Sequence, residues 1–167
     1  KLIRRHPHVF GEQQADSADV AYATWEQQKQ REKEAAGTNR SVLSGLPIAL
    51  PALLRAYRAG QKAAKVGFDW PDRGGPRAKL DEELHELDEA IQIGEASAIE
   101  DELGDVLFSV CNLARHLGIN PEVALSSTID KFQRRFTRVE EVFDYQLQEK
   151  SLTDMEAAWD AAKRAGL

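Results

Sequence analysis

The stretch SAIEDELGDVLFSVCNLARH, Ser97–His116, decides the fold, because its apolar residues recur every three or four positions. That spacing is typical of an amphipathic helix. The residues expected on its core face are Ile99, Leu103, Val106, Leu107, Val110, Leu113, Ala114 and Leu117. At about 100° per residue, the polar side chains share one narrow stripe formed by Glu102, Asp105, Ser109, Asn112 and His116. Most other positions, including Gly104, Phe108 and Cys111, are apolar or small. We therefore expect half-buried carboxylates, which need a cation or a hydrogen-bond partner.

A second acidic cluster, EELHE at Glu82–Glu86, precedes this helix. Residues three apart on a helix share a face, with Cβ atoms about 5–6 Å apart. Two carboxylate pairs follow, Glu83 with Glu86 and Glu102 with Asp105, and two antiparallel helices could direct all four at one point. A solvated acidic surface is the simpler alternative, but the half-buried second cluster favours a metal site. Oxygen ligands suit Mg²⁺, or Mn²⁺ in its place.

Composition excludes several classes of function. The 167 residues suffice for one domain with an appendage. A net charge of −6 and a pI near 5.3 argue against nucleic-acid binding. The lone Cys111 cannot form an internal disulfide, and no apolar run approaches the roughly 18 residues of a membrane span. We expect a cytoplasmic protein without a membrane partner.

The rest of the chain predicts an all-α protein, an antiparallel helical bundle. The expected helices are Asp19–Ala35, Pro51–Val66, Pro76–Ile93, Ser97–His116, Pro121–Tyr145 and Thr153–Ala165. Ser97 and a Thr153-x-x-Glu156 capping box are the expected amino-terminal caps, and Gly94 and Gly118 the expected stops. Asn120-Pro121 predicts another helix start. The expected buried stripe of that helix is Ile129, Phe132, Phe136, Val139 and Phe143.

An internal repeat suggests the domain organisation. KxxRR occurs at Lys1–Arg5 and Lys131–Arg135, and each copy is followed by WxxxK, at Trp25–Lys29 and Trp159–Lys163. Two ordinary basic helices are the alternative to shared ancestry. The chain begins with Lys1, and its only methionine is Met155. We therefore expect residues 1–36 to be the tail of a truncated first repeat, 37–50 a linker, and 51–167 a complete catalytic domain.

The second copy of the repeat carries groups suited to a nucleotide. Lys131 with Arg135, and Trp159 with Lys163, are i,i+4 pairs that share a helical face. Cations near a carboxylate site suit a polyanion, and an indole beside a lysine suits a base next to phosphates. Together with the acidic clusters, these residues predict a nucleotide bound through a metal.

At this point the sequence resembles the MazG nucleoside triphosphate pyrophosphohydrolases, an all-α group. The resemblance covers nearly all of residues 50–165. It rests on VGFDWP at Val66–Pro71, EELHE at Glu82–Glu86, ELGDVLF at Glu102–Phe108, NLARHLG at Asn112–Gly118, KFQRRF at Lys131–Phe136 and MEAAWDAAKR at Met155–Arg164. The leading KLIRRHPHVFG resembles the end of the first of two tandem MazG domains.

The resemblance implies hydrolysis of nucleoside triphosphates between the α- and β-phosphates, in a homodimer. It implies Mg²⁺ ligands at Glu83, Glu86, Glu102 and Asp105, and a water-activating carboxylate at Glu82 or Glu86. Lys131 and Arg135 match residues that hold the triphosphate, and Trp159 and Lys163 match a nucleotide-contacting pair. Asn112 is a further candidate for substrate contact. Two rival hypotheses are a non-catalytic helical assembly module and a di-iron carboxylate bundle using Glu82-x-x-His85, which lacks the second ExxH that such bundles need.

Overall fold

The computed structural model describes residues 41–167, and within them the chain is all-α, as predicted. The described helices are α4 (Ala52–Ala64), α5 (Gly74–Ile93), α6 (Ala96–His116), α7 (Pro121–Val142) and α8 (Leu152–Arg164). Residues 41–167 contain no strand. The predicted helix Asp19–Ala35 and the first copies of KxxRR and WxxxK lie outside the described residues. Leu46–Leu167 form one compact unit.

Local signals explain several helix ends. Asn120 caps α7, because its Oδ1 accepts hydrogen bonds from the amides of Glu122 at 3.0 Å and Val123 at 3.4 Å. Pro121 then occupies the first turn, as predicted. α5 ends at Gly94, whose φ of +83° is the left-handed conformation that glycine adopts at no steric cost. The predicted start of α7 and end of α5 are therefore confirmed.

Other predicted boundaries were wrong. α6 starts at Ala96, and Glu95 rather than Ser97 occupies its capping position, without a side-chain hydrogen bond. α8 is capped by Ser151, whose Oγ accepts from the amide of Asp154 at 3.1 Å, so the Thr153 capping box does not form. α7 ends at Val142 instead of Tyr145, since residues 144 and 145 both have positive φ.

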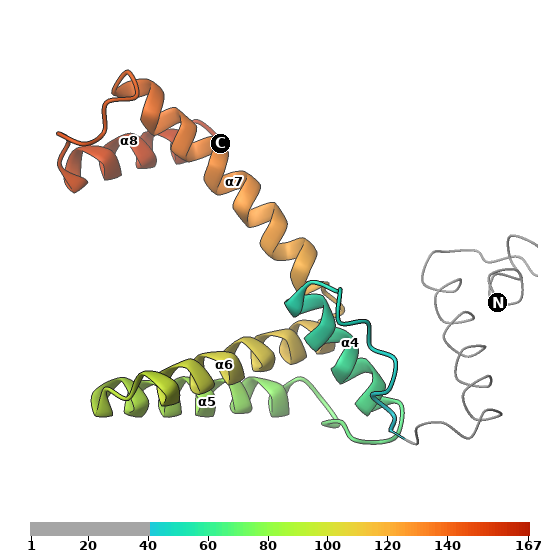
Figure 1. The fold of residues 1–167 in the computed structure, drawn as a ribbon. Helices are drawn as coiled ribbons and strands as arrows, with labels where there is room; N and C mark the ends of the chain where they lie inside the picture. The colour runs from blue at the N-terminus through green and yellow to red at the C-terminus, as the bar shows by residue number, and fades with distance from the viewer. Residues whose placement is uncertain (1–40) are drawn as a thin grey trace, which may run out of the picture. The chain divides into compact units, whose positions relative to one another are not determined.

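The helix α4 and two helical hairpins, α5 with α6 and α7 with α8, make up the described unit (Figure 1). α5 lies along α6, and the short connection at Gly94 and Glu95 makes them antiparallel. α4 packs on α6, and α8 packs on α7. Smaller contacts join α7 to α4 and α6. The acidic clusters therefore lie on one hairpin, while Lys131, Arg135, Trp159 and Lys163 lie on the other.

The buried side of α6 differs from the prediction. Val106 is buried as expected, but Leu103, Leu107, Val110 and Leu117 are between 41% and 48% exposed. Ser109 from the polar stripe and Cys111, expected to face outward, are buried instead. Ser109 and Cys111 point to nearly opposite sides of α6, at about 100° per residue, so two sides of the helix are covered and much of the apolar stripe between them is exposed.

α7 shows the same pattern. Of its expected buried stripe, Val139 is buried and Phe143 is partly buried. Ile129 is 47% exposed, Phe132 54% and Phe136 37%. Apolar surface of this extent is normally covered, and the sequence pattern therefore marked residues that remain exposed in the described part of the chain. No helix in residues 41–167 combines the length and apolar composition needed to cross a membrane.

Candidate active site

Three carboxylates meet between α5 and α6. Each of Glu83, Glu86 and Glu102 offers one oxygen within 4.8 Å of the others. Glu83 and Glu86 are three residues apart on α5, and Glu102 comes from α6, so the antiparallel hairpin assembles the group from two helices. Glu83 is only 5% exposed, while the other two are partly buried. The predicted convergence of these three residues is present in the structure.

A lysine one turn earlier on α5 balances part of this charge. Lys79 Nζ lies 2.8 Å from Glu82 Oε1 and 2.6 Å from Glu83 Oε1. These hydrogen bonds, to Glu82 first and then to Glu83, raise the pKa of Lys79. The lysine therefore stays protonated and forms an ion pair with the buried carboxylate of Glu83.

Excess negative charge remains at Glu86. Partial burial raises the pKa of its carboxyl above the ordinary value. Lys79 opposes the shift, while Glu83, Glu102 and Glu82 add to it through their charges. Crowded carboxylates of this kind favour a cation among them. Three hard oxygen donors from two helices are also the ligands that Mg²⁺ prefers, so these residues fit the predicted metal.

The remaining acidic-site candidates lie outside this group. Asp105, the predicted fourth ligand, is exposed on α6 and is not part of the three-carboxylate group. Glu82 is exposed and bonded to Lys79. The side chain of His85 is 76% exposed, and its Nε2 lies 3.3 Å from Glu89 Oε1. A di-iron bundle through His85 thus finds no support in the arrangement of α5 and α6.

Of the four nucleotide-binding candidates on α7 and α8, Arg135 and Trp159 lie close together. Arg135 Cζ lies 5.7 Å from the centroid of the Trp159 ring, and the centroid of the Phe132 ring lies 5.1 Å from that of Trp159. Arg135 Nε also donates to the carbonyl of Leu167 at 2.7 Å. Lys131 and Lys163 are exposed, with Lys163 Nζ 3.7 Å from Asp160 Oδ1. Arg135 and Trp159 thus form one surface, carried by a different helix pair from the carboxylates.

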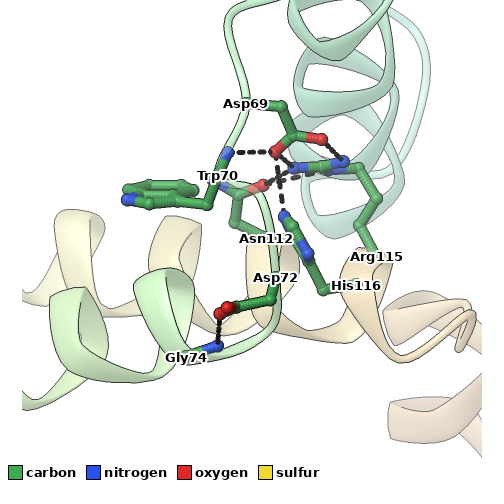
Figure 2. A network of polar contacts seen from close by, with 7 residues as sticks. All are labelled: Asp69, Trp70, Asp72, Gly74, Asn112, Arg115 and His116. Carbon is green, nitrogen blue, oxygen red and sulfur yellow. Dashed lines mark hydrogen bonds and ion pairs between the residues drawn. The ribbon is translucent and has the colours of Figure 1, made fainter.

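A second polar network lies at the carboxyl end of α6, and sequence reasoning missed it (Figure 2). Arg115 donates to both carboxylate oxygens of Asp69, at 2.8 and 2.5 Å, and His116 Nε2 lies 2.9 Å from Asp69 Oδ1. Arg115 also donates to Asn112. The hydrogen bond from Arg115 is the largest cause that holds the pKa of Asp69 far below its ordinary value. Asp69 and Arg115 are 46 residues apart, so no local sequence spacing predicts that they pair.

The network fastens the loop between α4 and α5 to α6. The amide of Trp70 donates to Asp69 Oδ1 at 2.9 Å, and the indole packs edge-on near His116, with centroids 6.4 Å apart. A Cβ at Gly75 would overlap the Trp70 ring, so the glycine at the start of α5 leaves space for the indole. This loop contains the GFDWP motif and approaches Asn112, the candidate for substrate contact.

Comparison with known proteins assigns the class. Residues 76–140 match the MazG nucleotide pyrophosphohydrolase domain, a stretch that includes both acidic clusters and Lys131. Residues 76–140 thus match a MazG domain, and the chain is similar to MazG proteins along nearly its whole length.

Individual relatives match along almost the whole chain. It is 41% identical over 169 residues to the nucleoside triphosphate pyrophosphohydrolase of Escherichia coli strain K12, covering 98% of this chain and 64% of that protein. Identity is also 41% to the Thermotoga maritima nucleoside triphosphate pyrophosphohydrolase/pyrophosphatase MazG, with coverages of 98% and 62%. A Bacillus subtilis protein, YabN, is 40% identical, with coverages of 98% and 34%. The chain thus spans less than two thirds of the length of these relatives.

Proposed function

We propose that this chain hydrolyses nucleoside triphosphates between the α- and β-phosphates, releasing a nucleoside monophosphate and pyrophosphate in a Mg²⁺-dependent reaction. The observation that carries the proposal is the convergence of Glu83, Glu86 and Glu102 within 4.8 Å in a chain that matches a MazG domain. The E. coli and T. maritima relatives are named for the same class of activity. From the acidic composition and the lone Cys111, we also propose that the protein is located in the cytoplasm.

Each acidic residue has a role in this proposal. Glu83, Glu86 and Glu102 hold the cation, and Asp105, three residues after Glu102, is the fourth ligand. A bound Mg²⁺ would supply Lewis-acid polarisation of the phosphate and acidify water. Glu86 or Glu82 orients the attacking water and accepts its proton.

The cationic and aromatic residues of the other hairpin complete the substrate site. Lys131, Arg135 and Lys163 offset the charge of the leaving pyrophosphate, and Trp159 packs against the base. The Phe132 ring and the Arg135 guanidinium already occupy positions beside the indole, which supports an aromatic surface at this point. Asn112 contacts the nucleoside from α6.

A homodimer brings the two groups together. Within one chain the carboxylates lie on α5 and α6, whereas the cationic group lies on α7 and α8. The uncovered apolar side chains of α6 and α7 supply the surface that a second copy would bury. The principal ones are Leu103, Leu107, Val110, Leu125, Ile129 and Phe132. Covering them with a partner is favourable at about 25 cal/mol per Å² of apolar surface.

A product assay tests the reaction. The wild-type chain is incubated with a panel of nucleoside triphosphates and Mg²⁺, and pyrophosphate and orthophosphate are measured separately. Pyrophosphate as the first product is expected, and orthophosphate in its place would overturn the reaction type. Glu102→Ala should abolish turnover while circular dichroism shows unchanged helicity. A variant that retains most pyrophosphate release would overturn the site. Calorimetry that shows no binding of Mg²⁺ and a non-hydrolysable nucleotide would instead favour a non-catalytic assembly module.

A further inference from the structure

The contacts of Arg115 decide which atom of Asn112 is left for a ligand. We infer that Arg115, locked by Asp69, is a positioning residue that presents the Asn112 amide nitrogen as a hydrogen-bond donor to the nucleoside part of the substrate. The inference rests on the proposed function and adds a specificity element to it. The ligand atom must be an acceptor, namely a base carbonyl oxygen, a ring nitrogen or a sugar oxygen.

The orientation of the Asn112 amide follows from the chemistry of its partner. Arg115 Nε lies 3.0 Å from Asn112 Oδ1, and an Arg115 terminal nitrogen lies 2.8 Å from the same oxygen. A guanidinium only donates hydrogen bonds, so the oxygen of the Asn112 amide, and not its nitrogen, must face Arg115. Nδ2 therefore turns away from Arg115. Among residues 41–167, the structure gives Nδ2 no acceptor, so its two hydrogens are left to a ligand or to water.

Arg115 cannot readily release that oxygen. Its side chain is 11% exposed, and Asp69 accepts from it through both carboxylate oxygens. Such paired, charge-assisted hydrogen bonds fix a guanidinium in direction as well as in position. Asp69 is held in turn by the Trp70 amide and lies within hydrogen-bond distance of His116 (Figure 2). Continuous hydrogen bonds thus connect Asp69 in the loop, through Arg115, to Asn112 in the polar stripe of α6.

Gly60 of α4 closes the Arg115 side of the amide. A Cβ at this position would lie 3.0 Å from Arg115 Nε and 3.2 Å from Asn112 Oδ1, closer than ordinary packing distances. Gly60 is itself buried. The backbone of α4 therefore lies against the bonded oxygen of Asn112 and leaves no space for a ligand at that oxygen beside Gly60.

The position of Asn112 along α6 indicates the part of the substrate it meets. It lies seven residues after Asp105 and ten after Glu102. At 1.5 Å per residue these steps are about 10 and 15 Å along the helix. A phosphate held by the carboxylates would be too far away to contact Asn112, whereas the attached sugar and base extend over that distance. A donor at this place selects among nucleosides and has little direct effect on the triphosphate.

The deciding variant is Asn112→Asp, which retains an oxygen for Arg115 and removes the donor. We expect the thermal midpoint to be no lower than that of the wild type. The KM for the best nucleoside triphosphate should rise roughly tenfold, with kcat little changed, which is the loss expected for one hydrogen bond to the substrate. Inorganic triphosphate, used as a competitor without a nucleoside, separates lost recognition from charge repulsion. Its inhibition constant should change less than twofold.

Arg115→Lys tests the positioning role. It retains the positive charge but loses the fork that holds Asp69 and Asn112 together. The same rise in KM is expected, again without a change in the inhibition constant of inorganic triphosphate. Gln148→Glu, on an exposed loop residue, adds the same single charge as Asn112→Asp and should leave both constants unchanged.

The outcomes separate this inference from the proposed function. If Asn112→Asp is as stable as the wild type and has the same KM, the donor role is wrong, although pyrophosphate release by the wild type still stands. Equal losses toward the nucleotide and inorganic triphosphate would overturn the nucleoside contact. If the wild type binds nucleotides without hydrolysing them, the proposed reaction fails. The same comparison of affinities, made with a non-hydrolysable triphosphate, then decides the role of Asn112. A wild-type chain that binds no nucleotide would overturn both.

Discussion

The ammonium group of Lys79 lies 2.6 Å from Glu83 Oε1, the most buried carboxylate of the acidic group. In the described chain, this lysine acts as the counter-ion that a cation would otherwise provide. A buried carboxylate without a partner is unfavourable, so Glu83 depends on one or the other. The stability of the metal-free protein and its stabilisation by metal therefore both depend on how the charge of Glu83 is neutralised.

Lys79→Met should therefore lower the thermal midpoint in chelator and increase the upward shift that Mg²⁺ produces. The reason is that Glu83 loses its built-in partner and no longer shares its oxygen with a lysine. Thermal unfolding with and without Mg²⁺ measures both effects. Arg77→Met is the matched control, since within residues 41–167 Arg77 pairs only with the exposed Asp81 on the same helix. A smaller Mg²⁺ shift in Lys79→Met than in the wild type would contradict this view.

Mg²⁺ should stabilise the wild type against unfolding, and a chelator should remove the effect. Binding to the folded state alone adds about 2.7 kcal/mol at a free concentration 100 times Kd. Glu102→Gln should lose the shift because it removes the α6 ligand. Asp101→Asn removes one charge from an exposed neighbour and should retain the shift. If both variants lose it equally, Mg²⁺ responds to net charge and not to the three-carboxylate group.

Asp69→Asn should destabilise the chain at pH 7 by roughly 1–3 kcal/mol, because a charged acceptor is lost from Arg115. The folded pKa of Asp69 is depressed, so its contribution is fully present above the unfolded value of about 3.9 and is lost as pH falls below it toward the folded pKa. Urea unfolding at pH 7 and pH 3 should show the gap between variant and wild type narrowing in acid. Asp88→Asn, on exposed α5 surface, should show no gap at either pH. A gap that widens in acid would rule out this account.

Leu107→Glu should convert a dimer to a monomer and reduce pyrophosphate release. Leu107 is 48% exposed on the uncovered face of α6, and a charge there cannot be buried against a second copy without a partner. Light scattering coupled to size exclusion measures the mass. Ile48→Glu, at a residue already 86% exposed, is the control and should leave the mass unchanged. A wild-type chain that is monomeric at assay concentration yet fully active would disprove the shared site.

Local patterns predicted much of the fold and part of the site. Asn120-Pro121 and Gly94 acted as expected, because capping and left-handed glycine need only neighbours along the chain. The convergence of Glu83, Glu86 and Glu102 also followed from spacing on two adjacent helices. The Ser97 cap failed because Glu95 took the capping position one residue before the helix starts, a choice that short-range propensity does not distinguish.

The sequence by itself determined the helical class, the carboxylate spacing and the cationic pairs, since each depends on residues within a few helical turns. Only the tertiary structure decided which face of α6 is covered, that Lys79 pairs with Glu83, and that Asp69 reaches Arg115 across 46 residues. The physical reason is that periodicity defines the faces of a helix but not the neighbour that packs on each face. The SAIEDELGDVLFSVCNLARH stretch carries both an apolar and a polar face, and packing by α5 and α4 left Ser109 and Cys111 buried on nearly opposite sides of the helix.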